Sequence, residues 1–529
     1  ALESCRMPNN ESDATLQTDL VLESAPTAHS LGRATGSGFS WLTLCLIAGK
    51  LLSFATQLVL GWYLFKEDFG LLAIATSIAN FVKVFNDGGV AQVLIQRGGT
   101  NFERLSTPAF WIGMVFSLIS AGLLALCAPW AAAIYDDARL VPMLLILALT
   151  MVLSAPATIF KAKLRLDMQF KTLSWQGTAW FFLRYVGTIL LAYWGFGAMS
   201  FVLPLPVVSI FECLVTYQAT RIAPWRGDAQ FSTWSHILGS SAWVLIASFA
   251  RAIARNGDYL VLGLLVSQGV VGQYFFGYQL TAQFAILMAS NIQFVLFPVL
   301  TRFANQPDRQ ASAMVRTIRM IMLVSGPISL MVALNIESLE TLLWHNKWAM
   351  VVPLMQVFSL FAPVRLIPDV LHAAITSRGE FRRSAQFLLM EGLVLMFSAW
   401  LAVVLCGTNL TGIAWVVGFS QTGFSLALTV FILNRHGISL GSIVAAILPS
   451  WACSVVATGV AWWIGSSCLP SEMLMSHVVF DTVVFSAVFL GLMRVFFASH
   501  LGELAGVLPN SLAGVIRRTL CLGVSLQST

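Results

Sequence analysis

Apolar residues fill most of the chain in long runs, each of a length that could cross a membrane. After a polar stretch at residues 1–37, fourteen such runs follow one another with short polar connections between them. A helix needs about 20 apolar residues to cross a bilayer. Backbone groups in lipid must be hydrogen-bonded within the segment, so we expect each run to be a helix. The predicted spans are 39–64, 69–94, 107–133, 140–162, 173–196, 198–220, 238–266, 272–300, 314–336, 348–375, 384–406, 411–433, 440–466 and 474–498.

The composition fits a chain that lies mostly in lipid. Of the 529 residues, 57% are hydrophobic and 10% are charged, and the mean hydropathy is +0.80. Soluble domains carry about 25% charged residues. The composition therefore excludes a soluble enzyme, a secreted domain and a disordered chain. It predicts an all-α polytopic membrane protein.

Lysine and arginine are distributed unevenly between the two sides of the predicted bundle. With the N-terminal tail in the cytoplasm, 21 of these residues lie on the cytoplasmic side, and only Lys66, Arg139 and Lys347 lie on the other. Positive residues accumulate on the cytoplasmic side of membrane proteins. We therefore expect both chain ends in the cytoplasm. The net charge of +6 then reflects topology, and we expect no nucleic-acid partner.

Two parts of the chain share landmarks at a near-constant spacing, 202 residues for two glycines and 211 for Val141-Pro142 against Val352-Pro353. Gly61 and Gly70 recur 202 residues later as Gly263 and Gly272. The spacing predicts two six-helix lobes of the same orientation with two helices appended, and parallel halves around a cleft are typical of transporters. The expected division is a polar disordered tail at 1–37, an N-lobe at 38–222, a C-lobe at 236–435, two further spans at 438–498 and a cytoplasmic segment at 499–529.

Ionisable residues inside the predicted spans are the strongest functional signal in the sequence. A charge at the bilayer centre costs about 2.5–3.5 kcal/mol on insertion scales, so such residues must face protein or a water-filled cavity. We predict a cationic cavity and assign to substrate binding Lys50, Lys83, Arg184, Arg251, Arg255 and Arg365. We assign to ion coupling or charge balance Asp87, Glu212 and Asp258. No metal ligand set and no cofactor are expected.

Some of these residues also have a purely structural explanation. Lys83 and Asp87 are i,i+4 neighbours, as are Arg365 and Asp369, and such pairs can neutralise each other within a helix. The remaining cations would suit an anionic substrate, because guanidinium groups bind phosphate oxygens through paired hydrogen bonds. Apolar walls could meanwhile shelter a hydrocarbon tail.

Two groups of motifs follow each other in the order of a known family. The N-lobe contains KEDFGLLA at 66–73 and AQVLIQR at 91–97, and the C-lobe contains RNGDYLVLG at 255–263, VGQY at 271–274 and LFPVLTR at 296–302. These stretches resemble the polysaccharide transporter (Wzx-type flippase) family of the multidrug/oligosaccharidyl-lipid/polysaccharide (MOP) exporter superfamily. The resemblance covers roughly residues 38–435.

The resemblance implies a flippase of a bacterial inner membrane that works by alternating access. Its cargo would be an undecaprenyl-diphosphate-linked oligosaccharide moved to the periplasmic leaflet for exopolysaccharide, capsule or O-antigen (lipopolysaccharide) synthesis. Implied partners are this lipid-linked oligosaccharide, the bilayer and a polysaccharide polymerase or chain-length complex.

Two other functions remain open from the sequence. A drug/cation antiporter of the same superfamily would favour an acidic cavity, whereas the six residues nearest mid-depth carry a net charge of +2: Lys50, Arg184, Arg251 and Arg255 against Glu212 and Asp258. A membrane-embedded acyl or glycosyl transferase could use His477 and Asp481, which share one helix face. The surroundings of that pair are apolar, which favours a transporter over an enzyme.

Overall fold

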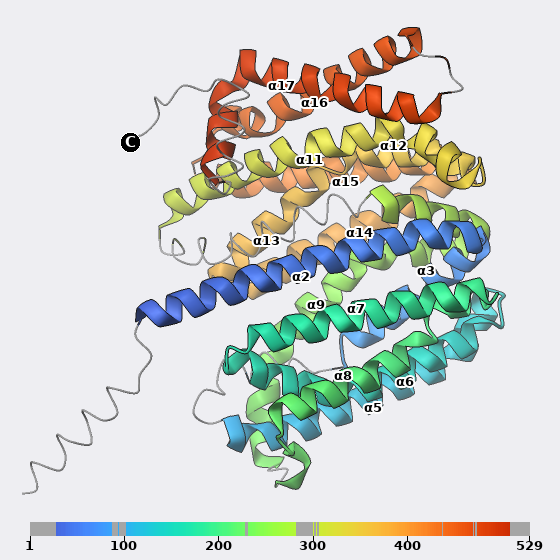
Figure 1. Ribbon diagram of the computed structural model, residues 1–529. Coiled ribbons are helices and arrows are strands. Elements are labelled where there is room, and N and C mark those ends of the chain that lie inside the picture. Colours follow the sequence, from blue (N-terminus) through green and yellow to red (C-terminus); the bar gives the residue numbers. More distant parts are fainter. Residues whose placement is uncertain are drawn as a thin grey trace, which may run out of the picture.

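The computed structural model describes residues 28–86, 94, 102–227, 231–281, 300, 303, 306–435, 437–468, 470 and 473–507. In these ranges the chain is built from helices, with no strand. Most helices run side by side along one direction, with α16 (Leu440–Cys468) and α17 (Leu474–Val507) at one edge of the bundle (Figure 1). The predicted all-α fold is confirmed.

Eight helical segments within the described ranges are long and apolar enough to cross a membrane. They lie in α5 (Phe102–Ile134), α6 (Leu140–Leu166), η2 (Gly197–Phe201) with α8 (Pro204–Thr220), α11 (Pro307–Trp344), α14 (Phe381–Cys406), α15 (Leu410–Asn434), α16 and α17. Five further predicted spans coincide with α2 (Ala28–Tyr63), α3 (Lys66–Lys83), α7 (Phe170–Tyr193), α9 (Phe231–Leu265) and the helical residues 268–281. The chain is a multi-pass membrane protein. Helix α2 begins inside the range expected for the tail.

The tenth predicted span is broken rather than straight. It consists of α12 (Val352–Phe361), the short η5 (Val364–Leu366) and α13 (Ile367–Ser377), and its two parts are bent by 57°. Pro363 stands at the break, where its ring and missing N–H cannot continue a helix. The break places Arg365 in the short connecting turn between two half-helices.

The helices form two packed groups. In the first, α5 packs on α6, α6 on α8, and α2 on α7. In the second, α9 packs closely on α14, α14 on α15, and α11 on α12, while α16 and α17 pack against α11. Figure 1 shows α5, α6 and α8 at the edge opposite α16 and α17, with α2, α9 and α14 between them. A cavity lies where α2, α3 and α7 of the first group face α9, residues 268–281 and α13 of the second.

The two groups cross at equivalent glycines of the predicted repeat. A Cβ atom on Gly70 would lie 2.1 Å from the main-chain oxygen of Gln268, and one on Gly272 would lie 1.7 Å from that of Lys66. Gln268 and Lys66 are themselves 202 residues apart, so the two contacts are related by the repeat. The contact that Gly61 makes with Phe276 recurs in the same way between Gly263 and Ile74. These contacts place a pseudo-twofold axis between the groups.

Candidate functional site

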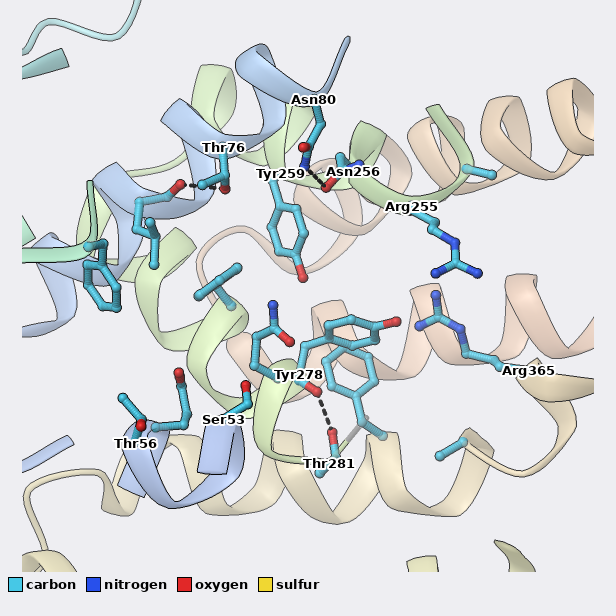
Figure 2. Close-up of a pocket in the computed structure, with 18 of the residues that line it drawn as sticks. Ser53, Thr56, Thr76, Asn80, Arg255, Asn256, Tyr259, Tyr278, Thr281 and Arg365 are labelled. Atoms are coloured by element: carbon cyan, nitrogen blue, oxygen red, sulfur yellow. Dashed lines mark hydrogen bonds between the residues drawn. The ribbon is translucent and has the colours of Figure 1, made fainter. Parts of the chain in front are cut away.

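A cavity of about 430 Å³ lies between the two groups of helices (Figure 2). This volume is in the range of small-molecule binding sites. Its charged lining consists of Arg184, Arg255, Arg365, Asp369 and Glu391. Its neutral polar lining consists of Ser53, Thr56, Gln57, Thr76, Asn80, Thr188, Asn256, Gln279 and Thr281. Its aromatic lining consists of Tyr185, Phe201, Tyr259, Phe275, Tyr278 and Phe358.

The position of Arg255 along its helix gives an expected depth for the cavity. Arg255 stands ten residues before the end of α9 at Leu265, which is about 15 Å along the helix axis. If α9 ends at the membrane surface, this is about half of a hydrocarbon core of about 30 Å. A charge at this depth is tolerated because it faces the cavity and other polar groups.

Two arginines from different helices face each other on one side of the cavity (Figure 2). Arg255 on α9 forms an ion pair with Asp369 of α13, with 3.6 Å between Nη2 and Oδ1. The guanidinium carbon of Arg365 lies 5.0 Å from the ring centre of Tyr278, a cation–π distance. Glu391 lines the cavity nearby, and its carboxylate lies 3.5 Å from Nε2 of the buried His372.

A buried carboxylate lies behind the arginine pair. Asp258 is 3% exposed, and its Oδ2 accepts a hydrogen bond of 3.0 Å from the hydroxyl of Tyr274. Its charge attracts Arg365, whereas its Oδ1 has no hydrogen-bond partner. Asp258 is therefore coupled electrostatically to the cavity without lining it.

Hydrogen bonds join the two groups at one end of the bundle. Lys347, between α11 and η4 (Ala349–Val351), donates hydrogen bonds from Nζ to the main-chain oxygens of Gly61, Trp62 and Leu64, at 2.8–3.0 Å. The indole nitrogens of Trp344 and Trp348 donate to the oxygens of Leu58 and Gly61, each at 3.0 Å. The carbonyls of Gly61 and Trp62 are among those that the end of α2 leaves without a partner in the helix. Burial lowers the pKa of the Lys347 ammonium, and the charge of Asp68 opposes that shift.

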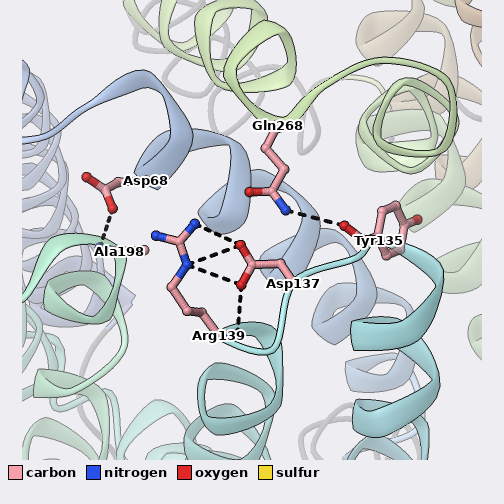
Figure 3. Close-up of polar contacts among 6 residues, drawn as sticks. All are labelled: Asp68, Tyr135, Asp137, Arg139, Ala198 and Gln268. Carbon is pink, nitrogen blue, oxygen red and sulfur yellow. Dashed lines mark hydrogen bonds and ion pairs between the residues drawn. The ribbon is translucent and has the colours of Figure 1, made fainter.

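A second polar cluster lies at the same end (Figure 3). Asp137 and Arg139, in the turn between α5 and α6, form a bidentate pair at 2.8–3.1 Å. Burial acts to raise the pKa of Asp137, but the hydrogen bonds from Arg139 outweigh it and lower that pKa. Gln268 donates to the main-chain oxygen of Tyr135 at 3.3 Å, which is another bond between the two groups. Asp68 accepts from the backbone N–H of Ala198 at 3.0 Å.

Comparison with known proteins identifies the family. Residues 59–353, more than half of the chain, match the profile of the family described as polysaccharide biosynthesis protein. The chain belongs to this polysaccharide biosynthesis family. The lipopolysaccharide biosynthesis protein WzxC of Escherichia coli (strain K12) is 21% identical over 68% of this chain and 73% of its own length. The teichuronic acid biosynthesis protein TuaB of Bacillus subtilis (strain 168) is 22% identical over 82% of this chain and 90% of its own.

Solved structures show where this member of the polysaccharide biosynthesis family belongs by fold. The lipid II flippase MurJ in its inward closed conformation has a TM-score of 0.68 and 11% identity, covering 86% of this chain and 98% of its own. An inward-facing multidrug resistance MATE family transporter of the MOP superfamily has a TM-score of 0.60 and 12% identity, covering 74% and 94%. These two structures share the fold of this chain. The match to proteins titled flippase and transporter agrees with the expectation of a transporter rather than an enzyme.

The structure of this family member brings some of the predicted site residues together. Arg184, Arg255 and Arg365 line the cavity. The guanidinium of Arg184 stacks between Trp180 and Tyr185, at 5.1 and 5.6 Å from the ring centres. Lys50 and Arg251 are absent from the lining, although the charge of Arg255 repels both of them.

Three other predicted residues lie elsewhere or outside the described ranges. Glu212 on α8 pairs with Lys161 of α6 and accepts a hydrogen bond of 2.8 Å from Gln176, so it balances charge within the first group. Lys83 is at the end of α3 and does not line the cavity. Asp87 lies outside the described residues, so its expected pairing with Lys83 is not tested.

The expected pair between Arg365 and Asp369 is wrong. The ion pair of Asp369 is with Arg255 on another helix, and Arg365 lies over Tyr278. The i,i+4 rule assumes one continuous α-helix. Arg365 lies in η5 and Asp369 in the first turn of α13, so the two do not share a regular helix face.

The neutral polar lining was missed by an interpretation that weighed charges alone. Its signal is present in the sequence as spacing: Ser53, Thr56 and Gln57 stand at i, i+3 and i+4 in α2, and Thr76 and Asn80 stand at i and i+4 in α3. Such spacing puts polar side chains on one face of an otherwise apolar helix. In a membrane protein, a polar face of this kind marks a cavity.

Proposed function

We propose that this protein is a flippase that moves polyprenyl-diphosphate-linked oligosaccharide units, of the undecaprenyl type, to the periplasmic leaflet of a bacterial inner membrane. The observation that carries the proposal is a cavity between the two groups of helices, lined by three arginines, with the Lys347 hydrogen bonds joining the groups at one end of the bundle. Family membership supports a role in polysaccharide biosynthesis, and the MurJ-like fold supports alternating access. The product pathway would be exopolysaccharide, capsule or O-antigen synthesis.

The arginines suit the diphosphate of such a cargo. Three arginines against Asp369 and Glu391 leave the lining with a net positive charge, and Lys50 and Arg251 add to the positive potential nearby. Guanidinium groups bind phosphate oxygens in a bidentate manner. A transporter of organic cations would need the opposite balance, so the lining favours an anionic cargo.

The distribution of basic residues supports an orientation for the cycle. Lys66, Arg139 and Lys347 lie at the end of the bundle where the Lys347 hydrogen bonds join the groups, and all other lysines and arginines outside the spans were expected on the opposite side. Under the positive-inside rule this end is periplasmic and both termini are cytoplasmic. The cavity would then receive cargo from the cytoplasmic leaflet. The two lobes that move in this cycle would be residues 38–222 and 236–435, and residues 438–498 would be two appended helices. A polymerase or chain-length complex would receive the product.

Asp258 is the best-placed group for ion coupling. It is buried beside Tyr274, and its charge acts on Arg365. Binding of a proton or Na⁺ at Asp258 would remove its attraction for Arg365 and change how strongly that arginine holds an anion. Glu212 is already paired with Lys161 and serves charge balance.

Binding measurements on the purified protein in nanodiscs test the proposal, with farnesyl diphosphate as the probe. We expect Arg255→Gln and Arg365→Gln each to weaken binding about tenfold or more, because a hydrogen bond to a charged group contributes about 1.5–3 kcal/mol. Arg435→Gln is the matched control, since Arg435 follows α15 and lies over Phe431 away from the cavity. In cells, the two cavity variants should lose surface polysaccharide. Binding of tetraphenylphosphonium in place of the diphosphate would overturn the proposal.

A further inference from the structure

The repeat makes the two sides of the cavity directly comparable, and they differ in charge. Because the glycine contacts are related by an offset of 202 residues, lining residues can be paired by the same offset. Ser53 of the N-lobe then corresponds to Arg255 of the C-lobe, and Thr76 corresponds to Tyr278. The C-lobe side carries the arginine pair, whereas α2 and α3 present hydroxyls and carboxamides.

Figure 2 shows this division in space. Arg255 and Arg365 lie together on one side of the cavity, and Ser53 and Thr56 line the side away from them. Asn80 lies between, where its amide donates to Asn256 of the other lobe at 3.3 Å. A ligand that fills the cavity therefore meets the arginine pair with Asp369 and Glu391 on one side and, apart from Arg184, neutral hydrogen-bonding groups on the other.

Two lining groups related by the repeat have no hydrogen-bond partner. The Nε2 of Gln57 and the hydroxyl of Tyr259 are both buried and unpartnered, and the two residues are 202 positions apart. Tyr259 is 3% exposed, and its side chain points into the cavity in Figure 2. Buried polar groups in proteins nearly always have a partner, so both groups are available to a molecule in the cavity.

We infer that Gln57 and Tyr259 form a subsite that selects the first, neutral sugar of the cargo, while Arg255 and Arg365 hold its diphosphate. The inference rests on the proposed function and adds an orientation of the cargo in the cavity, with the diphosphate at the arginines and the first sugar at Gln57 and Tyr259. Carboxamide and phenol groups both donate and accept, which matches the mixed donor and acceptor character of sugar hydroxyls. Arg184, the N-lobe cation of the lining, is held between the rings of Trp180 and Tyr185.

Two probes separate the subsite from the diphosphate site. The protein in nanodiscs is titrated with farnesyl diphosphate and with the same molecule carrying one neutral hexose on its diphosphate. We expect Gln57→Leu and Tyr259→Phe each to weaken binding of the hexosyl probe about tenfold and to leave farnesyl diphosphate within twofold of wild type. Site groups that hydrogen-bond a ligand hydroxyl discriminate strongly against its absence.

Matched controls come from similar residues outside the cavity. Gln421 on α15 is also buried with an unpartnered Nε2, so Gln421→Leu controls for the loss of a buried carboxamide. Tyr217→Phe on α8 controls for the loss of a phenol. Both should leave the binding of both probes unchanged. Gln57→Met, which keeps the length of the side chain, replaces Gln57→Leu if the latter unfolds.

The outcomes distinguish the subsite from the proposed function. If Arg365→Gln weakens farnesyl diphosphate binding while Gln57 and Tyr259 variants keep the wild-type ratio between the two probes, the subsite is wrong and the proposed function stands. An equal loss for both probes in the Gln57 and Tyr259 variants also overturns the subsite. If the wild-type protein binds neither probe, the proposed function fails and the subsite fails with it.

Discussion

The Nζ atom of Lys347 lies 3.0 Å from the main-chain oxygen of Gly61, across the boundary between the two groups of helices. The same ammonium also binds the carbonyls of Trp62 and Leu64, so one side chain caps the end of α2 from the other lobe. A transporter that opens at this end has to break all three bonds together.

Lys347→Met should favour opening at this end. Hydrogen bonds to a charged group contribute about 1.5–3 kcal/mol each, so losing three of them should raise the open population at least tenfold. Double electron–electron resonance between spin labels at Tyr63 and Met350 measures the separation. Lys163→Met, a lysine whose ion pair with Asp167 stays within the first group, is the control. A distance distribution identical to wild type would show that Lys347 does not hold the end closed.

Gly70→Ala should disturb the crossing of the lobes. Its Cβ would lie 2.1 Å from the main-chain oxygen of Gln268, and a carbonyl in a helix start cannot move aside as a flexible side chain does. Overpacking of this kind costs about 1–3 kcal/mol. Thermal unfolding in detergent measures the loss. Gly113→Ala on α5, where nothing lies within 4 Å of the added Cβ, should be neutral or slightly stabilising.

Glu212→Gln should lower stability without changing cargo binding. It leaves Lys161 without its carboxylate, and because the Lys161 side chain is 30% exposed the cost should be about 1–2 kcal/mol, below that of a fully buried pair. Unfolding temperature and farnesyl diphosphate affinity are measured in parallel. A marked drop in affinity with unchanged stability would instead connect Glu212 to the transport site.

The Asp137–Arg139 pair should contribute stability that depends on pH. The folded pKa of Asp137 is lowered, so its contribution is present above the ordinary aspartate pKa of about 3.9 and is lost as the pH falls through the folded value. Arg139 is 55% exposed, so solvent limits the effect to under about 1 kcal/mol. Unfolding of wild type and Asp137→Asn should differ at pH 7 and converge as the pH falls below the lowered folded pKa of Asp137. A constant difference would exclude the pair as its source.

The position of a charged residue along its helix could be read from the sequence, but the direction in which its side chain faces around the helix could not. The count of residues along α9 places Arg255 at mid-depth, and the structure adds that it faces Asp369 and the cavity. The same count gave Glu212 an equivalent depth, yet it faces Lys161. Which side of a helix meets a cavity depends on packing against other helices, which sequence position alone does not specify.

The repeat was predictable because it rests on glycines. Gly70 and Gly272 are needed where two backbones approach closely, so their spacing survives in the sequence. The break at Pro363 was not anticipated within an apolar run that reads as one span, and it moved Arg365 away from Asp369. Tyr259 was missed because a lone phenol in an apolar run carries little signal until its surroundings are known, whereas Gln57 shares a polar face with Ser53 and Thr56 that the sequence does show.

The paired glycine contacts make the boundary between the lobes resemble the interface of a homodimer, although both halves belong to one polypeptide. Gly70 touches the turn that carries Gly272, and Gly272 touches the turn that carries Gly70, as in an isologous contact. A shift at one crossing therefore requires a matching shift at the other. The residues that line the cavity can therefore differ between the two lobes, as they do here. The glycine contacts cannot change independently, because each one depends on the other.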